Sequence, residues 1–149
     1  NEVMPLVRKQ FPEAKLMLAG VRPDQKVRDL ASEHTDVTGW VEDIRDCYAK
    51  AKVFVAPMMI GTGLQNKLLE AMAMGIPCVT STLANNALQA KPEVEILIAQ
   101  TPEQYAEHIL ALLENQAEAD KLAEAGHQLV ANHFSWEGAT KPLLDILKS

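Results

Sequence analysis

The stretch that decides the fold runs from residue 53 to residue 81 and reads VFVAPMMIGTGLQNKLLEAMAMGIPCVTS. It opens with a β-branched and aromatic run at 53–57, which predicts a buried strand. A loop with two glycines follows, then a helix at 64–75 closed by Gly75, and a second apolar strand at 77–81. Short apolar strands joined by a helix are typical of a parallel sheet.

The same alternation extends along the rest of the chain. Further strands are predicted at residues 14–20, 36–40 and 94–99, and helices at 1–11, 23–34, 41–51, 101–115, 117–132 and 136–148. Five apolar strands that alternate with helices predict an α/β fold, a Rossmann-like doubly wound parallel sheet covered on both faces, with extra C-terminal helices. These last helices are expected to pack over the sheet edge or reach toward another domain.

The length, charge and hydrophobicity of the chain exclude some classes of protein. With 149 residues, the chain is long enough for one domain with a substantial core. The formal net charge of -6 argues against a nucleic-acid surface, which would be basic. No apolar run approaches the roughly 20 residues of a membrane span. Because the chain opens at Asn1 inside a helical pattern, we interpret it as a piece of a longer protein.

The cysteines and histidines do not point to a metal or a disulfide. Cys47 and Cys78 lie far apart and form no CxxC pair, which favours reduced thiols in a cytoplasmic protein. The four histidines have no metal-ligand spacing with them, so neither a metal nor another cofactor is expected.

A ligand of such a sheet binds beyond the carboxyl ends of the strands. The loops there are predicted at 20–22, 39–41, 57–64 and 80–82, and the third leads straight into a helix. The free N–H groups and the positive dipole end of that helix suit a phosphate, although the glycines could also serve only as turn residues. A dinucleotide fingerprint would need glycine at Asn66 and an acid about 20 residues further on, and 79–90 holds no acid. The P-loop pattern is absent from the sequence as well.

Lys67 and Glu70 follow this loop one helical turn apart, and Glu70 is the only charged residue between Lys67 and Lys91. A lysine here can reach a diphosphate, and a carboxylate can accept hydrogen bonds from two adjacent hydroxyls, as on a ribose. The alternative is a surface ion pair with little effect. The apolar flanks predict that Glu70 is substantially buried, and an isolated buried charge is costly, which favours the functional interpretation.

The stretch at 53–81, preceded by LAGVRPD, VRDLA and DVTGWVEDIRDCYAKA, resembles the C-terminal donor-binding domain of GT-B glycosyltransferases, in the retaining group called family 4 or group 1. The pattern LEAMAxGxPxV after a strand and a glycine loop is specific to that group, and the resemblance covers nearly the whole chain. The final FSWEGATKPLLDIL resembles the helix that crosses back to the N-terminal domain. The version of the motif found here is most similar to bacterial sugar transferases linked to exopolysaccharide and exosortase loci.

The resemblance implies retaining transfer of a sugar from a nucleotide-diphosphate donor to a sugar or lipid-linked acceptor, without a required metal. Residues 1–149 would be the nucleotide-sugar-binding domain of a two-domain enzyme, without its N-terminal acceptor domain or the first strand of its own domain. The fragment alone would then hold no catalytic residue and be inactive. The full-length protein would be cytoplasmic and could associate peripherally with the inner face of the membrane.

The resemblance also assigns donor-binding roles by position. The loop amides around Gly61, Thr62, Gly63 and Leu64 would hold the diphosphate, with Lys67 beside it, and Glu70 matches the second glutamate of an E-x7-E pair, which holds the ribose. The first glutamate is replaced by Thr62, which leaves the identity of the sugar open. The backbone of Val41 matches the position that meets the base. Arg22, after the turn at Gly20, is either a donor contact or a solvated arginine.

Two other functions stay open. The chain could be a nucleotide-binding or regulatory module that has lost the chemistry, which Thr62 would favour, or a GT-B sugar-nucleotide epimerase. Asn85 and Asn86, which follow the strand at 77–81, are expected to be structural or loop residues and not ligand contacts, because asparagine tolerates left-handed turn conformations.

Overall fold

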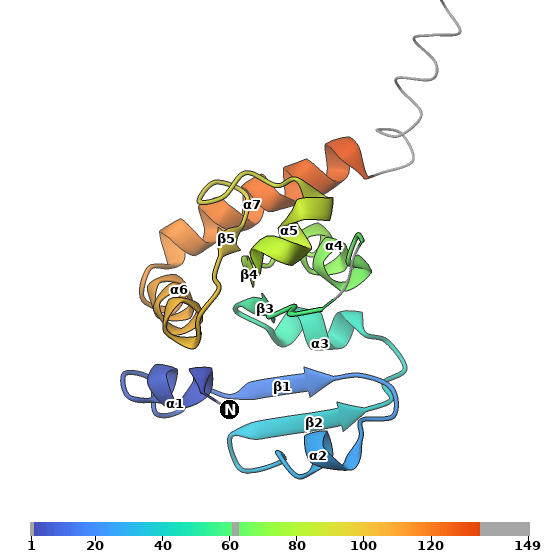
Figure 1. Cartoon of the computed structure of the whole chain (residues 1–149), viewed down its shortest axis with the longest axis vertical. Coiled ribbons are helices and arrows are strands. Elements are labelled where there is room, and N and C mark those ends of the chain that lie inside the picture. The colour runs from blue at the N-terminus through green and yellow to red at the C-terminus, as the bar shows by residue number, and fades with distance from the viewer. Residues whose placement is uncertain (1, 61–62, 135–149) are drawn as a thin grey trace, which may run out of the picture.

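A computed structural model describes residues 2–60 and 63–134 of the chain (Figure 1). Helices and strands alternate through most of it, and the last two helices follow each other directly. In chain order the elements are α1 (Val3–Arg8), β1 (Leu16–Ala19), α2 (Gln25–Arg28), β2 (Thr35–Gly39), α3 (Arg45–Lys50), β3 (Phe54–Ala56), α4 (Asn66–Ala73), β4 (Cys78–Thr80), α5 (Thr82–Leu88), β5 (Leu97–Ile98), α6 (Pro102–Glu114) and α7 (Gln116–His133).

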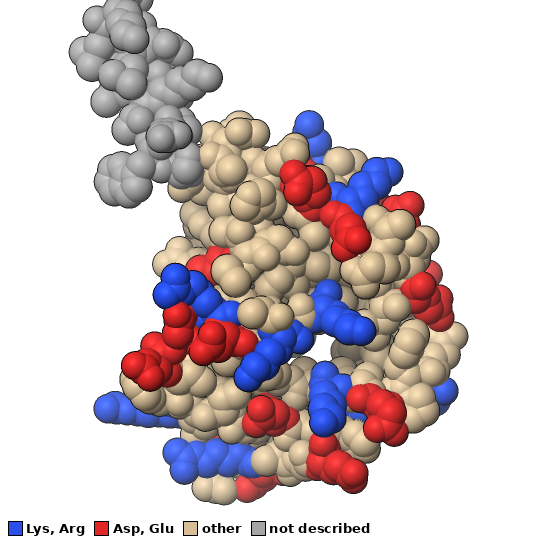
Figure 2. Space-filling model, turned by 180° about the vertical axis from the view of Figure 1, so that it is seen from behind, with Lys and Arg blue, Asp and Glu red and all other residues tan. Residues whose placement is uncertain are grey.

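All strand pairs are parallel, as the alternation predicts, but they form two groups. One group is β1–β2, and the other is β3–β4–β5, with β4 in the middle. Among the described residues no ladder joins β1 to β3. The parallel strands and their flanking helices confirm the predicted α/β class. In Figure 2, Lys and Arg side chains gather around a hollow between the lower part of the molecule, which holds β1 and β2, and the rest.

A strand that is paired on both edges is more deeply buried than a strand that is paired on one edge. Every residue of β4 is buried, because β4 has a partner on both edges and helices on its faces. The equally apolar β1 and β3 are only half-buried along their whole length. Each of them is hydrogen-bonded to one neighbouring strand among the described residues, so each keeps one free edge.

Helices α1 and α6 pack against each other and connect the two groups of strands. Val7 of α1 is fully buried against Ala106 and Ile109 of α6. The Arg8 guanidinium donates hydrogen bonds to the carbonyls of Ala14, at 3.1 Å, and His34, at 2.9 Å, next to the starts of β1 and β2. The first group is thereby fixed to the helices of the second.

Most predicted elements form where the sequence places them. Helix α6 begins with the predicted Thr101 cap and Pro102, and the side chain of Gln104 completes a capping box. The predicted helix at 23–34 shortens to the four residues of α2, and α5 was not predicted. The expected helix at 136–148 lies outside the described residues. Both cysteines are free thiols, and Cys78 is buried.

Within residues 2–60 and 63–134, no helix combines the length and the apolar character that crossing a bilayer requires.

Candidate functional site

The loops after β1, β2 and β3 contain backbone conformations that are uncommon for ordinary residues. Gly39, at the end of β2, has a φ of +67°, and Gly63 has a φ of +131°. Both values lie in the region that favours glycine, so these two glycines are required by the chain path. Arg22 has a φ of +57° although it carries a side chain, which is rare outside turns and functional sites. The predicted loops are thus sharply turned.

The helix that follows the glycine loop has no side chain capping its N-terminus. Gln65 stands at the N-cap position without donating or accepting a capping hydrogen bond. The amides of Leu68 and Leu69 bond to the Gln65 carbonyl at 3.0 and 3.2 Å, whereas no described residue accepts from the amides of Asn66 and Lys67. By contrast, Ser81, Thr101 and Asn115 cap the helices that follow them. Free amides at a helix start are the groups that bind phosphate in other proteins.

Glu70 is exposed, which corrects the prediction that it is substantially buried. Helix α4 turns Leu68, Ala71 and Met72 into the core, where each is at most 1% exposed. Glu70 and Lys67 lie on the opposite face of the helix and are both open to solvent. The apolar residues that flank Glu70 in the sequence therefore form the buried face of an amphipathic helix, and they do not surround the carboxylate.

Lys67 and Glu70 do not form the surface ion pair that was the alternative. In the part of the chain that the structure describes, the one ion pair joins Asp43 and Arg45, at 2.6 Å. The side chain of Lys67 has no hydrogen-bond partner among those residues. A cation and an anion thus lie on the exposed face of the helix, near its uncapped start, without neutralising each other.

Tyr48 of α3 is the hydrogen-bond partner of Glu70 and a residue to which the sequence analysis gave no role. Its hydroxyl donates to Glu70 Oε2 at 2.9 Å, and it lies 3.3 Å from the Lys67 carbonyl oxygen. Burial raises the pKa of Tyr48, and the hydrogen bond to Glu70 raises it further, so the phenol stays a neutral donor. The contact joins residues 22 positions apart, which no local sequence pattern reveals.

The remaining predicted site residues lie in the same loops with fewer contacts. Gly20 follows β1 directly, and a Cβ there would meet no atom within 4 Å, so packing does not require a glycine. Val41 is half-buried in the loop after β2, and Leu64 is 40% exposed after Gly63. The predicted contacts at Gly61 and Thr62 lie outside the described residues.

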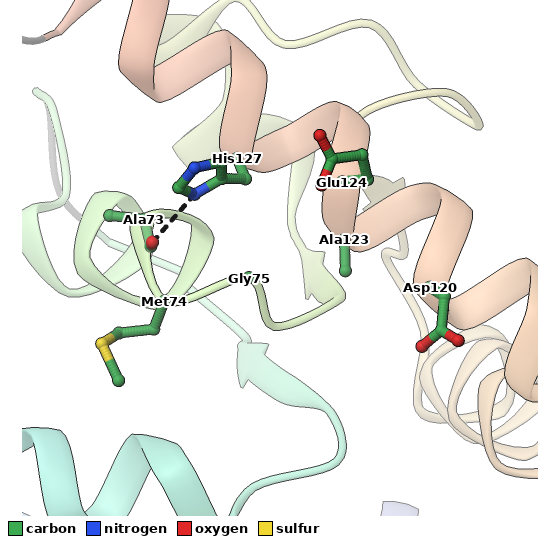
Figure 3. Close-up of a pocket in the computed structure, with 7 residues that line it drawn as sticks. All are labelled: Ala73, Met74, Gly75, Asp120, Ala123, Glu124 and His127. Atoms are coloured by element: carbon green, nitrogen blue, oxygen red, sulfur yellow. Dashed lines mark hydrogen bonds between the residues drawn. The ribbon is translucent and has the colours of Figure 1, made fainter.

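A pocket lies at the opposite end of α4, where Ala73, Met74 and Gly75 meet α7 (Figure 3). His127 of α7 donates from Nδ1 to the Ala73 carbonyl at 2.9 Å and so binds the C-terminal end of α4. Asp120 and Glu124 line the same pocket. Within residues 2–60 and 63–134, no three His, Cys, Asp or Glu side chains come together in a way that could hold a metal.

Asn85 is structural, as predicted, but for another reason than a left-handed turn. It lies in α5, and its side chain binds both the amide and the carbonyl of Ala90, at 3.1 and 2.9 Å. Gln89, at the end of the helix, takes the left-handed conformation, with a φ of +58°. Asn86 is exposed.

The sequence family described as glycosyl transferases group 1 matches residues 1–115. The chain belongs to this family. Among its relatives is the phosphatidyl-myo-inositol mannosyltransferase of Mycobacterium leprae, which is 27% identical over 155 residues. That match covers 99% of this chain and 41% of the relative. The chain spans only 29% to 41% of the length of the curated relatives it matches.

Solved structures of glycosyltransferase domains share the fold. The C-terminal domain of the group 1 glycosyl transferase LpcC from Francisella tularensis matches with a TM-score of 0.76 at 18% identity, over 91% of this chain and 77% of that one. Alr3699/HepE from Anabaena, solved in complex with UDP, matches with a TM-score of 0.80 at 14% identity, over 99% of this chain and 44% of that one. The fold is therefore that of a GT-B glycosyltransferase C-terminal domain, with parallel strands and flanking helices.

Proposed function

We propose that this group 1 glycosyltransferase chain is the donor-binding domain of a larger enzyme and binds a nucleotide-diphosphate sugar. The observation that carries the proposal is the arrangement on α4, where Lys67 and Glu70 lie unpaired with each other at the uncapped start of a helix. A cation beside free amides suits a diphosphate, and a carboxylate one turn further on suits the two hydroxyls of a ribose. The UDP bound to the structurally similar Alr3699/HepE supports this ligand class.

The other loops complete the proposed donor site. The amides of Gly61, Thr62, Gly63 and Leu64 would contact the diphosphate, and the Val41 backbone would meet the base. Gly20 and Arg22, after β1, would lie beside the donor as well, and the Arg22 guanidinium would then be one of its contacts. No metal is needed in this proposal, because Lys67 and the amides supply the positive charge near the phosphates.

Transfer itself would take place against an acceptor held by a further domain, with retention at the anomeric carbon. A sugar or lipid-linked acceptor in bacterial polysaccharide or glycoconjugate synthesis fits the family, and the whole enzyme would work in the cytoplasm, associated peripherally with the membrane. Because all proposed contacts of this chain are with the donor, we expect it to bind donor nucleotide and to transfer no sugar alone.

Calorimetric titration of the 149-residue chain with UDP, GDP and ADP, and with the matching nucleosides, tests the proposal. One diphosphate should bind, and its nucleoside should bind more weakly. Glu107→Gln on α6 and Lys121→Ala on α7 change exposed charges on other helices and serve as controls that should bind like the wild type. Absence of binding for all three diphosphates, or sugar transfer by this chain alone, would contradict it.

The second candidate function is a non-catalytic nucleotide-binding module. It is favoured by Thr62, which stands where the family has its first glutamate. Transfer activity of the longer protein separates the two functions. Turnover of the donor without any acceptor would instead indicate an epimerase.

A further inference from the structure

The phenol of Tyr48 extends from the core to the exposed face of α4. Tyr48 is 6% exposed, and its ring packs against Phe54 with the ring centroids 5.8 Å apart. Its hydroxyl reaches Glu70 Oε2 at 2.9 Å and the Lys67 carbonyl oxygen at 3.3 Å. A side chain fixed by core packing is thus bonded to a carboxylate that is open to solvent.

This bond is not explained by the need of a buried hydroxyl for a partner. The carbonyl and the carboxylate are both acceptors, so the single phenol proton is shared, and the shorter contact is to Glu70. The Lys67 carbonyl alone would satisfy the hydroxyl. The chain also tolerates the buried hydroxyl of Tyr105, which has no partner among the described residues.

The bond has two consequences for Glu70. An exposed glutamate samples several rotamers, and ordering it when a ligand binds weakens the affinity, whereas a carboxylate ordered beforehand avoids that loss. Only Oε2 is engaged by Tyr48, and no described residue donates to Oε1. Oε1 therefore keeps its lone pairs for two ligand hydroxyls.

We propose that Tyr48 is a positioning residue of the donor site, which orders Glu70 before the nucleotide binds and leaves Oε1 to accept the ribose hydroxyls. This inference rests on the proposed function of Glu70. Tyr48 lies in α3, which begins at Arg45, so its bond to Glu70 also joins α4 to the helix that follows the expected base loop at residues 39–41.

The experiment compares Tyr48→Phe with the wild-type chain by calorimetry, using the diphosphate that binds best among UDP, GDP and ADP and its 2′,3′-dideoxy analogue. Tyr48→Phe should weaken binding of the diphosphate by about threefold to tenfold, the loss expected when one flexible side chain must be ordered on binding. The dideoxy analogue lacks both hydroxyls, so its affinity should agree between the two proteins within about twofold, the usual additivity error. Tyr105→Phe removes a hydroxyl without a partner and should change neither affinity.

Two further proteins separate positioning from folding. Adding Tyr48→Phe to Glu70→Ala should cause no further loss of affinity, because the group it orders is gone. 4-Aminophenylalanine at position 48 keeps a donor on the ring and should retain wild-type affinity even if Tyr48→Phe fails to fold.

The outcomes are distinct. If the wild type binds a diphosphate and Tyr48→Phe binds it equally well, the inference is wrong and the proposed function stands. The inference is also wrong if the diphosphate and its dideoxy analogue lose affinity equally, or if the 4-aminophenylalanine variant loses it like Tyr48→Phe. If the wild type binds none of the diphosphates, the proposed function fails and the inference with it.

Discussion

Replacing Glu70 by glutamine is expected to weaken nucleoside diphosphate binding by about tenfold to a hundredfold. In the wild type the Tyr48 hydroxyl donates to Oε2. An amide that keeps this bond has its oxygen in the place of Oε2 and its nitrogen in the place of Oε1. The ribose hydroxyls would then face an N–H donor where the wild type offers a charged acceptor.

The magnitude follows from the bonds that are lost. A hydrogen bond to a charged group contributes about 1.5–3 kcal/mol. At about 1.4 kcal/mol for each factor of ten, the affinity should fall by roughly one to two orders of magnitude. Folding should be nearly unaffected, because Glu70 is exposed and the Tyr48 hydroxyl keeps an acceptor in the amide oxygen or in the Lys67 carbonyl. Surface substitutions usually change the free energy of unfolding by no more than about 0.5 kcal/mol.

Calorimetric titration and a thermal melt measure both quantities on the same protein, with Glu107→Gln as the control for loss of one exposed carboxylate. Wild-type affinity in Glu70→Gln would refute the role of Glu70. A large drop in melting temperature would refute the argument in another way, because it would mean that the carboxylate mainly stabilises the fold.

Three further variants, and Asn86→Ala as a control, test the candidate site and the packing around it. Lys67→Ala should weaken diphosphate binding far more than nucleoside binding, because Lys67 is proposed to face the phosphates; equal losses for both ligands in the titration would contradict this. Gly126→Ala should lower the free energy of unfolding by about 1–3 kcal/mol in a denaturant melt, although alanine favours helices, because the added Cβ would lie 2.9 Å from the Glu95 carbonyl oxygen and 3.1 Å from a Met72 side-chain carbon. Asn85→Ala should lower it by about 1–3 kcal/mol, because the Ala90 amide and carbonyl lose their partner, whereas Asn86→Ala should have little effect; similar melts for the two would show that the Ala90 bonds are unimportant.

The elements with strong local signals were predictable from the sequence. Thr101 and Pro102 mark the start of α6, and the run from β3 through α4 to β4 forms as its apolar pattern indicates. The alternation also gave the parallel strands correctly. Their division into two groups was not predictable, because periodicity says nothing about which edges of distant strands meet.

The sequence predicted where the candidate site lies, but not whether its side chains are buried or exposed. Apolar flanks suggested a buried Glu70, yet the stripe of α4 faces the core at Leu68, Ala71 and Met72 and leaves Glu70 outside. Helix α5 was missed because its two asparagines have low helix propensity. It forms because the Ser81 side chain caps its start and Asn85 binds the chain beyond its end. Both corrections come from contacts that depend on the folded chain.

The candidate site is carried by a helix of eight residues, too short to be stable alone, so its position must come from tertiary packing. The close approach of α7 at Gly126 sets its buried side, His127 binds its C-terminal end, and Tyr48 binds its exposed face near the start. Only the last of these contacts involves a group proposed to touch the ligand. Changes at Gly126 should therefore act on stability and leave the affinity of the folded protein nearly unchanged, whereas changes at Tyr48 should act on the affinity for ligands that carry ribose hydroxyls. If Glu70 is ordered on a rigid helix before the ligand binds, changes at these two positions should affect different quantities, stability at Gly126 and affinity at Tyr48. A mobile Glu70 carboxylate would not produce this difference.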